Sequence, residues 1–442
     1  MSAALEFDDR TGSARRPASA VVRTLAAMMP ALVLSYSALI DPLVNLGLDR
    51  GLHFGGVELG AERKTRLAQI FMPFFLLSAV ALAVLSSLSV PARLVRVATP
   101  GILLVALALV SAAWSQAPGD TLQLAGYQTI LFGSLLTFVA VSRDPARIAR
   151  WVLALFALVV AVNLVAVLTR PPGPIGHQGI YQFKNTLGAA GGCAFLFGLF
   201  HVLDRRFAWR WIGRFTVLGA LALVLASDSK TALALMLLAP AAAIALYIAC
   251  RLLRIGPMAA GLLLLTLGGF ALLLVAAVLG MSFDDILVAA YGDATFTGRT
   301  HIWNFALDHA RQTPVIGNGY RAFWSLGLAS PKHGSEIEFI RTIGSGHSGF
   351  VDIFLDLGLV GLALLLAFVL AAFSAAGQVS LRSAGRTLLY VSVVLFVVGR
   401  NAMESVILWS TFFDNLAFVL VAFLAAYREN DGAPAPVRRR FG

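Results

Sequence analysis

Cysteine, charge and recognisable cofactor motifs are scarce in this sequence. Its two cysteines, Cys193 and Cys250, lie in or near separate apolar runs, so no disulfide framework is expected. Only 13% of the 442 residues are charged and 59% are hydrophobic, which excludes an ordinary soluble globular protein. The seven histidines show no HxxxH or HExxH spacing, and there is no P-loop, GxSxG or dinucleotide fingerprint. The sequence therefore predicts no metal and no cofactor, and the energy for any reaction would have to come with the substrate.

Long hydrophobic runs fill most of the chain. A membrane-spanning helix needs about 20 apolar residues, and windows of that size predict an all-α polytopic membrane protein with about twelve transmembrane helices. The shortest window is 386–400, and the first contains Asp41-Pro42 toward its far end. The predicted windows are residues 24–46, 67–90, 94–113, 122–142, 148–169, 186–203, 212–228, 231–249, 257–280, 348–374, 386–400 and 405–427.

Basic residues are concentrated between alternate windows. Arginines before the first window, after the fourth, sixth and eighth, and in the C-terminal tail are all separated by even numbers of crossings. The positive-inside rule makes that side cytoplasmic, with both termini on it. The segment 49–66 carries four basic residues on the outer side, so either it violates the rule or the first two spans are misread. The net charge of +11 thus follows from residues flanking helices, and no nucleic acid is expected as a partner.

The same pattern defines the organisation of the chain. We expect a cytoplasmic N-terminal tail at 1–22, a membrane domain at 23–427 and a cytoplasmic C-terminal tail at 428–442, with both tails disordered. One long polar loop, 282–346, interrupts the membrane domain on the outer side. Within it, a helix from about Gly298 to Arg311, capped by Thr297, is expected to lie on the membrane surface.

Two short outer segments carry candidate anion-binding residues. Lys184 and Asn185 would open one helix, and a helix N-terminus beside an ammonium group suits a phosphate. Alternatively, Asn185 caps the helix and Lys184 reaches to the membrane interface. Lys230 follows Ser229 in a tight turn, where it is either a ligand or an ordinary solvated lysine.

The long loop adds Arg299 and Arg321. A guanidinium group can bind phosphate through two parallel hydrogen bonds, but both arginines could equally contact lipid headgroups.

A histidine and an acid complete the candidates. His347 opens the tenth span, where the positive end of the helix favours a neutral imidazole that can act as a general base. A cap or headgroup contact is the other interpretation. Further along, Arg400 and Glu404 are four residues apart and could pair. Asp414 lies deeper in the last span, so it should be protonated, paired or facing a wet cavity.

Together these segments resemble the O-antigen ligase and polysaccharide polymerase superfamily, and within it the ExoQ-like, Wzy-type exopolysaccharide repeat-unit polymerases. The resemblance covers about residues 110–415, with Lys230 where an arginine is usual. The matching residues, in chain order, are Trp114-Ser115, Pro118, Thr121-Leu122, Phe183-Lys184-Asn185, Ser229-Lys230-Thr231, Gly298-Arg299-Thr300, Trp303, Gly317, Gly319, Tyr320, Phe323, His347-Ser348, Gly358, Gly361, Asn401, Glu404 and Ser405.

The resemblance implies a metal-independent glycosyltransferase of the bacterial inner membrane. Its donor would be a glycan on undecaprenyl pyrophosphate, and its acceptor another lipid-linked repeat unit for a polymerase or lipid A core for a ligase. A non-catalytic glycan binder or a transporter is the remaining alternative. His347 would be the base, with Glu404 competing for that role. The pyrophosphate and substrate would contact Arg299, Lys184, Asn185, Lys230, Tyr320, Arg321 and Arg400. Membrane lipids and chain-length-regulating and export proteins are further candidate partners.

Overall fold

The computed structural model describes residues 6–7, 14–15, 18–45, 57–203, 207–282, 285, 298–326, 329–380, 384–409 and 412–427. Most of the predicted N-terminal tail, all of the C-terminal tail, and residues 283–284, 286–297 and 327–328 of the predicted outer loop therefore lie outside the described residues. The predicted domain boundaries stay predictions.

The described chain is almost entirely helical, which confirms the predicted all-α polytopic class. Eleven helices are long and apolar enough to cross a membrane. A two-residue strand pair, β1 (Glu6–Phe7) and β2 (Ala14–Arg15), precedes them. The long helices are α1 (Ala20–Ser35, continued by η1, Tyr36–Ile40, and α2, Asp41–Asn45), α3 (Val57–Ser86), α4 (Ala92–Val110), α5 (Pro118–Ser142), α6 (Pro145–Thr169), α7 (Lys184–Val202), α8 (Phe207–Ser227), α9 (Lys230–Leu253), α10 (Pro257–Leu279), α15 (Gly349–Ser380) and α16 (Ala384–Met403).

The twelfth predicted span is a shorter helix than expected. Instead of 405–427, α17 covers Phe413–Ala425, and every residue in it is buried. It packs against α15, α16, α5, α1, α4 and α7, so it is the centre of the helix bundle. The shortening has a local cause, because the side chain of Asn401 accepts hydrogen bonds from Val406 N (3.2 Å) and Ile407 N (2.8 Å) and holds residues 404–408 as a turn.

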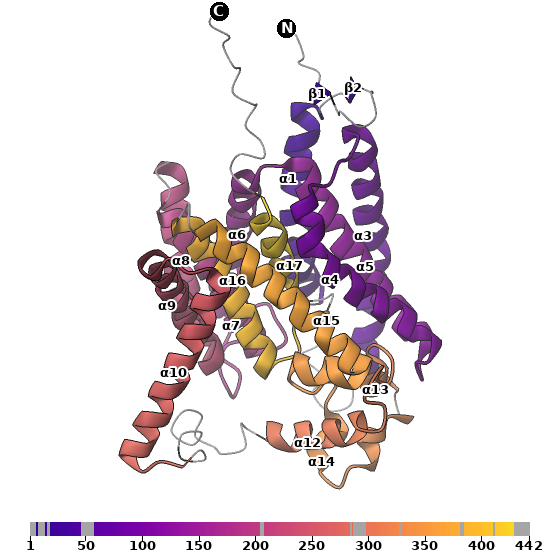
Figure 1. Ribbon diagram of the computed structural model, residues 1–442. Coiled ribbons are helices and arrows are strands. Elements are labelled where there is room, and N and C mark those ends of the chain that lie inside the picture. The colour runs from indigo at the N-terminus through magenta and orange to yellow at the C-terminus, as the bar shows by residue number, and fades with distance from the viewer. Residues whose placement is uncertain are drawn as a thin grey trace, which may run out of the picture.

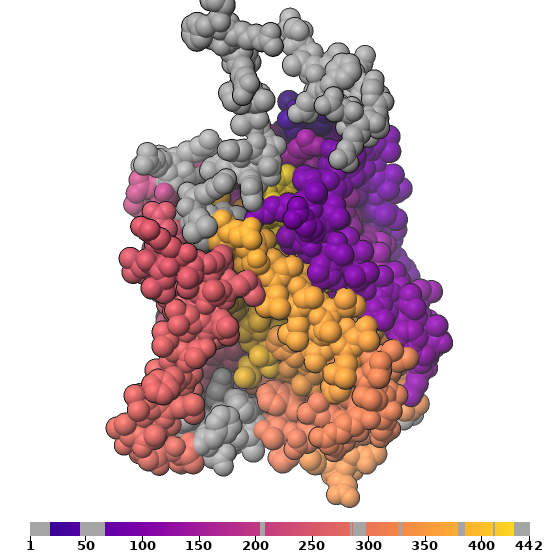
Figure 2. All heavy atoms as spheres, viewed as in Figure 1, coloured from indigo at the N-terminus to yellow at the C-terminus, as the bar shows by residue number. Residues whose placement is uncertain are grey.

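Helix α10 differs from α17 in being apolar but exposed. Few of its side chains are buried, so an apolar surface faces outward along most of its length, as expected for a helix in lipid. It meets α15 near its N-terminal end, where a Cβ on Gly377 would lie 2.3 Å from Pro257 Cβ. Toward Leu279 it diverges from α15, and Figure 2 shows it at one edge of the molecule.

Short helices occupy one end of the bundle. They are α12 (Arg299–Ala310), α13 (Ala322–Ser325), η5 (Pro331–Gly334) and α14 (Glu338–Thr342), all from the predicted outer loop. Figure 1 places α12 and α14 at the end of the bundle opposite β1 and β2. The beginnings of α7 and α15 and the end of α16 lie at the same end as α12. Helix α15 packs against α12, and Glu404, just after α16, bonds to both Arg299 of α12 and Asn185 of α7.

Helix α12 corrects two expectations. Its N-cap is Gly298, with a φ of 81°, and not Thr297, which lies outside the described residues. Its apolar side, including Ile302 and Ala306, packs in a cluster with Phe323, Trp324 and Leu355, and so covers protein rather than a membrane surface.

The loop after α12 packs against the backbone of α15 at a glycine. At Gly358 (φ 64°, ψ −162°) α15 is kinked, and the freed amides of Leu359 and Val360 donate to the carbonyls of Pro314 (2.8 Å) and Val315 (3.2 Å). A Cβ on Gly358 would lie 2.3 Å from Val315 C. Glycine is therefore required at position 358, because the backbone of the loop lies too close for a side chain there.

Candidate functional site

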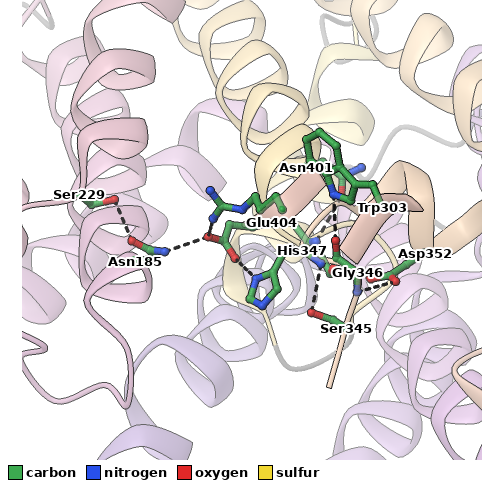
Figure 3. Close-up of polar contacts among 12 residues, drawn as sticks. Asn185, Ser229, Trp303, Ser345, Gly346, His347, Asp352, Asn401 and Glu404 are labelled. Carbon is green, nitrogen blue, oxygen red and sulfur yellow. Dashed lines mark hydrogen bonds and ion pairs between the residues drawn. The ribbon is translucent and has the colours of Figure 1, made fainter. Parts of the chain in front are cut away.

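Four segments that are distant in sequence bring a histidine, a glutamate, an arginine and an asparagine together. His347 Nδ1 lies 3.3 Å from Glu404 Oε2. Arg299 Nη2 and Asn185 Nδ2 each donate to Glu404 Oε1 at 2.8 Å. Figure 3 shows Asn185 and His347 converging on the Glu404 carboxylate, which lies just after α16. We call these four residues the His–Glu cluster.

The hydrogen bonds define the role that each imidazole nitrogen can play. An ionised carboxylate only accepts hydrogen bonds, so Nδ1 of His347 carries the proton that faces Glu404. In the neutral ring, Nε2 then has a free lone pair. The side chain of His347 is 37% exposed, against 19% for Glu404 and 16% for Arg299. Of these three side chains, the imidazole is the most open to an incoming group.

The charge state of Glu404 follows from its neighbours. Burial raises the pKa of its carboxyl group, but the hydrogen bond from His347 and the positive charge of Arg299 lower it by more. The net pKa lies below the ordinary value, so Glu404 is ionised at neutral pH. An anion held this way orients the imidazole and would stabilise it once protonated.

A tight turn presents His347. The residue has a φ of 48° and lies two residues before the start of α15, so the prediction that it opens that helix is wrong in detail. On one side, Gly346 N donates to Asp352 Oδ1 (2.8 Å). On the other, Gly346 O accepts from Trp303 Nε1 of α12 (3.0 Å). Trp303, from the helix that was expected to lie on the membrane surface, thus holds this turn.

The turn around Glu404 is bonded to the start of α15, next to the turn that presents His347. Gly349 N, at the start of α15, donates to Glu404 O at 3.2 Å. A Cβ on Gly349 would lie 2.0 Å from Asn401 Oδ1, so only glycine fits between the two helices here. The ends of α15 and α16 are thus fixed against each other.

Of the two candidate lysines, Lys184 binds carbonyl groups and an acid of the neighbouring loops. Its Nζ donates to the carbonyls of Ile175 (2.9 Å) and Asp228 (3.1 Å) and lies 3.7 Å from the Asp228 carboxylate. Lys230 is exposed at the first position of α9. Its neighbour Ser229 donates to Asn185 Oδ1 at 3.3 Å, which places the α8–α9 turn beside the His–Glu cluster.

Arg321 and Tyr320 hold the long loop to the turn before α17. The guanidinium carbon of Arg321 lies 3.5 Å from the centre of the Trp409 ring. Tyr320 is buried, and its hydroxyl donates to Leu408 O. Its backbone is fixed as well, because its amide donates to Ser111 Oγ (2.9 Å) and its carbonyl accepts from Thr121 Oγ1 (2.9 Å).

Arg400 does not pair with Glu404 as expected. Its guanidinium group is buried and pairs with the Asp414 carboxylate, which joins α16 to α17. Of the three alternatives expected for Asp414, namely protonated, paired or facing a wet cavity, the structure shows pairing. The spacing of four residues between Arg400 and Glu404 fails as a guide because α16 ends at Met403 and the chain turns there.

Asp352 is a polar residue of the site that the sequence analysis missed. It is 3% exposed in the first turn of α15 and accepts from Gly346 N, Trp324 Nε1 and Ser405 Oγ. An acid within an apolar run is itself a functional signal, so its position in the tenth window could have identified it. Within the described ranges, no three His, Cys, Asp or Glu side chains are placed to hold a metal ion.

The fold and the cluster together define a polytopic membrane protein with a histidine–carboxylate pair and an arginine at one end of its helix bundle. Residues 215–366 match a family described as O-antigen ligase. The matched region includes α12 and His347 and ends before Glu404.

A curated relative is also similar to the chain. Over 208 residues it is 30% identical to the exopolysaccharide production protein ExoQ of Rhizobium meliloti (strain 1021). The alignment covers 46% of this chain and 47% of the relative, so the chain matches about half the length of that protein. The two matches confirm the resemblance to the O-antigen ligase family and its ExoQ-type members that the motifs predicted.

Proposed function

We propose that this protein is a membrane glycosyltransferase that joins undecaprenyl-pyrophosphate-linked oligosaccharide repeat units into exopolysaccharide at the periplasmic face of the inner membrane. One observation carries the proposal: the His–Glu cluster combines a partly exposed imidazole, an ionised carboxylate and a guanidinium group within hydrogen-bonding distance. The O-antigen ligase match and the similarity to the exopolysaccharide production protein ExoQ support a glycan-processing enzyme.

In the proposed step, an acceptor hydroxyl attacks the anomeric carbon of the donor sugar. The hydroxyl proton passes to Nε2 of His347, and a new carbon–oxygen bond forms. The bond between the anomeric carbon and the pyrophosphate oxygen breaks, and its electron pair leaves with the pyrophosphate. A positioned general base typically contributes about 10²–10⁴-fold to such a rate.

Cationic groups neutralise the charge that develops on the leaving pyrophosphate. Arg299 is the cation within the cluster, and one of its nitrogens remains committed to Glu404. Lys230 lies exposed beside the α8–α9 turn and supplies a second positive charge without the planar geometry of arginine. No metal takes part in the proposed mechanism.

The geometry favours His347 over Glu404 as the base. Both carboxylate oxygens of Glu404 already accept hydrogen bonds, from Arg299, Asn185 and His347. A lowered pKa also makes this carboxylate a poor proton acceptor. Glu404 therefore orients the imidazole in the proposed mechanism.

The O-antigen ligase match favours a second candidate, transfer of finished glycan to lipid A core. Mass analysis of lipid-linked glycans in a deletion strain distinguishes the two. Single repeat units should accumulate if the protein is the polymerase, and complementation with the wild-type gene should remove them. Polymer accumulating on the lipid carrier would identify a ligase. If His347→Ala complements fully, the protein is a non-catalytic binder or a transporter.

A further inference from the structure

We propose that Asp352 is a positioning residue whose single buried carboxylate sets the relative placement of His347 and Glu404. The proposal rests on the function proposed above and adds a residue to its machinery. It starts from the hydrogen bonds of Asp352. Oδ1 accepts from Gly346 N (2.8 Å) and Trp324 Nε1 (2.9 Å), and Oδ2 accepts from Ser405 Oγ.

Two of these donors are chain neighbours of the His–Glu cluster. Gly346 immediately precedes His347, and Ser405 immediately follows Glu404. One carboxylate thus holds the turn that presents the imidazole and the turn that presents its acidic partner. The two turns are otherwise separated by all of α15 and α16.

The third segment of the cluster is linked to the same turn. The carbonyl of Gly346 accepts from Trp303 Nε1, and Trp303 lies one helical turn after Arg299 in α12. Gly346, the residue before His347, is therefore held at its amide by Asp352 and at its carbonyl by the helix that carries Arg299. A rotation of this turn would change the His347–Glu404 distance of 3.3 Å.

Packing leaves little freedom for any other arrangement. A Cβ on Gly346 would lie 2.7 Å from Asp352 Oδ1, so the turn and the carboxylate are in direct contact. The next acid along the helix, Asp356, has no comparable role. It accepts from Arg321 N at 2.8 Å, and its Oδ1 has no hydrogen-bond partner among the described residues. Of these two acids, Asp352 is the one whose carboxylate bonds to both turns, alongside the backbone bond from Gly349 N to Glu404 O.

Chemistry suggests two informative substitutions. In Asp352→Asn, the amide oxygen can still accept from Gly346 N and Trp324 Nε1, while its NH₂ group donates to Ser405 Oγ, which can also accept. Asp352→Ala removes all three contacts. Misplacement of reacting groups by about 1 Å can cost about 10²-fold in rate. We expect Asp352→Asn to keep kcat within about tenfold and Asp352→Ala to lose about 10²-fold, with KM for the lipid-linked donor nearly unchanged.

The matched control is Asp308→Ala, which removes an exposed acid from α12 and should leave kcat unchanged. In a His347→Ala background, Asp352→Ala should cause no further loss, because the positioned group is already absent. If Asp352→Ala fails to insert, Ser405→Ala removes only the contact on the Glu404 side and should lower kcat without lowering protein abundance. Two results would overturn the proposal. One is a loss of kcat in Asp352→Asn as large as that in Asp352→Ala. The other is a double variant, His347→Ala with Asp352→Ala, whose loss of kcat is the product of the two single losses.

A second readout does not depend on which reaction the protein catalyses. The rate at which diethyl pyrocarbonate modifies His347 in isolated membranes can be followed by peptide mass spectrometry. We expect Asp352→Ala to raise this rate severalfold over wild type and Asp352→Asn to leave it close to wild type. Unchanged reactivity in Asp352→Ala contradicts the positioning role. The two proposals can fail separately. If Asp352→Ala raises the reactivity of His347 but the wild-type protein makes no polymer, the positioning role is upheld and the proposed function is rejected.

Discussion

The guanidinium group of Arg400 is paired with Asp414, and Glu404 is therefore left to Arg299, whose Nη2 lies 2.8 Å from Glu404 Oε1. The two pairs have different surroundings. The first is buried between the last turn of α16 and the first turn of α17, where it neutralises an acid that would be costly alone. The second lies at the end of the bundle beside His347, where an anionic substrate can compete for the arginine.

Arg299 should be needed for activity in a way that lysine cannot replace fully. We expect Arg299→Ala to abolish polymer and Arg299→Lys to restore only part of it, since a point charge lacks the planar fork. Losing a charged hydrogen bond costs about 1.5–3 kcal/mol. Polymer length and amount on gels provide the measurement. Arg311→Ala, at the exposed end of the same helix, is the control. If a stable Arg299→Ala protein makes normal polymer, Arg299 is not needed for the reaction and only contacts lipid headgroups.

His347 should be essential for turnover but not for insertion. We expect His347→Ala to lower the rate by about 10²–10⁴-fold while the protein remains abundant and still binds lipid-linked donor. His347→Gln keeps a hydrogen-bonding side chain that cannot take up the proton, so it should fail as well. Single-turnover assays with purified donor would measure the rate. Substitution of the exposed His333 by Ala should have no effect. Turnover restored by glutamine would make Glu404 the base to test next.

The lowered pKa of Glu404 predicts a pH-dependent stability difference. Unfolded glutamate titrates at about 4.3, and its folded pKa lies below the ordinary value. Its ionised form therefore stabilises the folded state above about pH 4.3, and this contribution is lost as pH falls through the folded pKa. Detergent-solubilised Glu404→Gln should melt below wild type at neutral pH, and the difference should shrink in acid. A difference that grows in acid would show that the folded pKa is raised.

Glycine substitutions can test the attachment of the long loop. Gly317 has a φ of 68°, and a Cβ there would lie 2.3 Å from Asp356 C. Because backbone atoms cannot move aside easily, Gly317→Ala should cost at least about 1–3 kcal/mol and lower the melting temperature. On α10, a Cβ at Gly268 meets nothing within 4 Å, so Gly268→Ala is the matched control. Equal melting temperatures would show that the loop is not fastened at Gly317.

The predicted orientation can be tested with a matched pair of cysteines. Ser335 is buried, so a label attached there would be hindered. Gly334 and Gly256 are exposed, and a Cβ at either position meets nothing within 4 Å. We expect an impermeant maleimide to label Gly334→Cys in intact cells and Gly256→Cys only after permeabilisation, as the positive-inside rule requires. The reverse pattern would place the His–Glu cluster on the cytoplasmic side.

Local composition was sufficient for the membrane architecture. The windows around 148–169 and 257–280 correspond closely to α6 and α10, because hydropathy over some 20 residues is a property of the sequence alone. The same reasoning failed at 405–427. There the side chain of Asn401 takes the place of helical carbonyls as the acceptor for Val406 N and Ile407 N, a competition that hydropathy does not describe.

The sequence by itself also determined which residue types are available for chemistry, including His347, Arg299 and Glu404. Only the tertiary structure decided how they are paired. Arg400 pairs with Asp414, and Lys184 bonds to the carbonyls of Ile175 and Asp228. Asp352 joins the two turns that carry His347 and Glu404. These pairings link residues far apart in the chain and depend on how helices pack at one end of the bundle. No spacing within a single segment encodes that packing, because it arises from side chains and glycines of several helices at once.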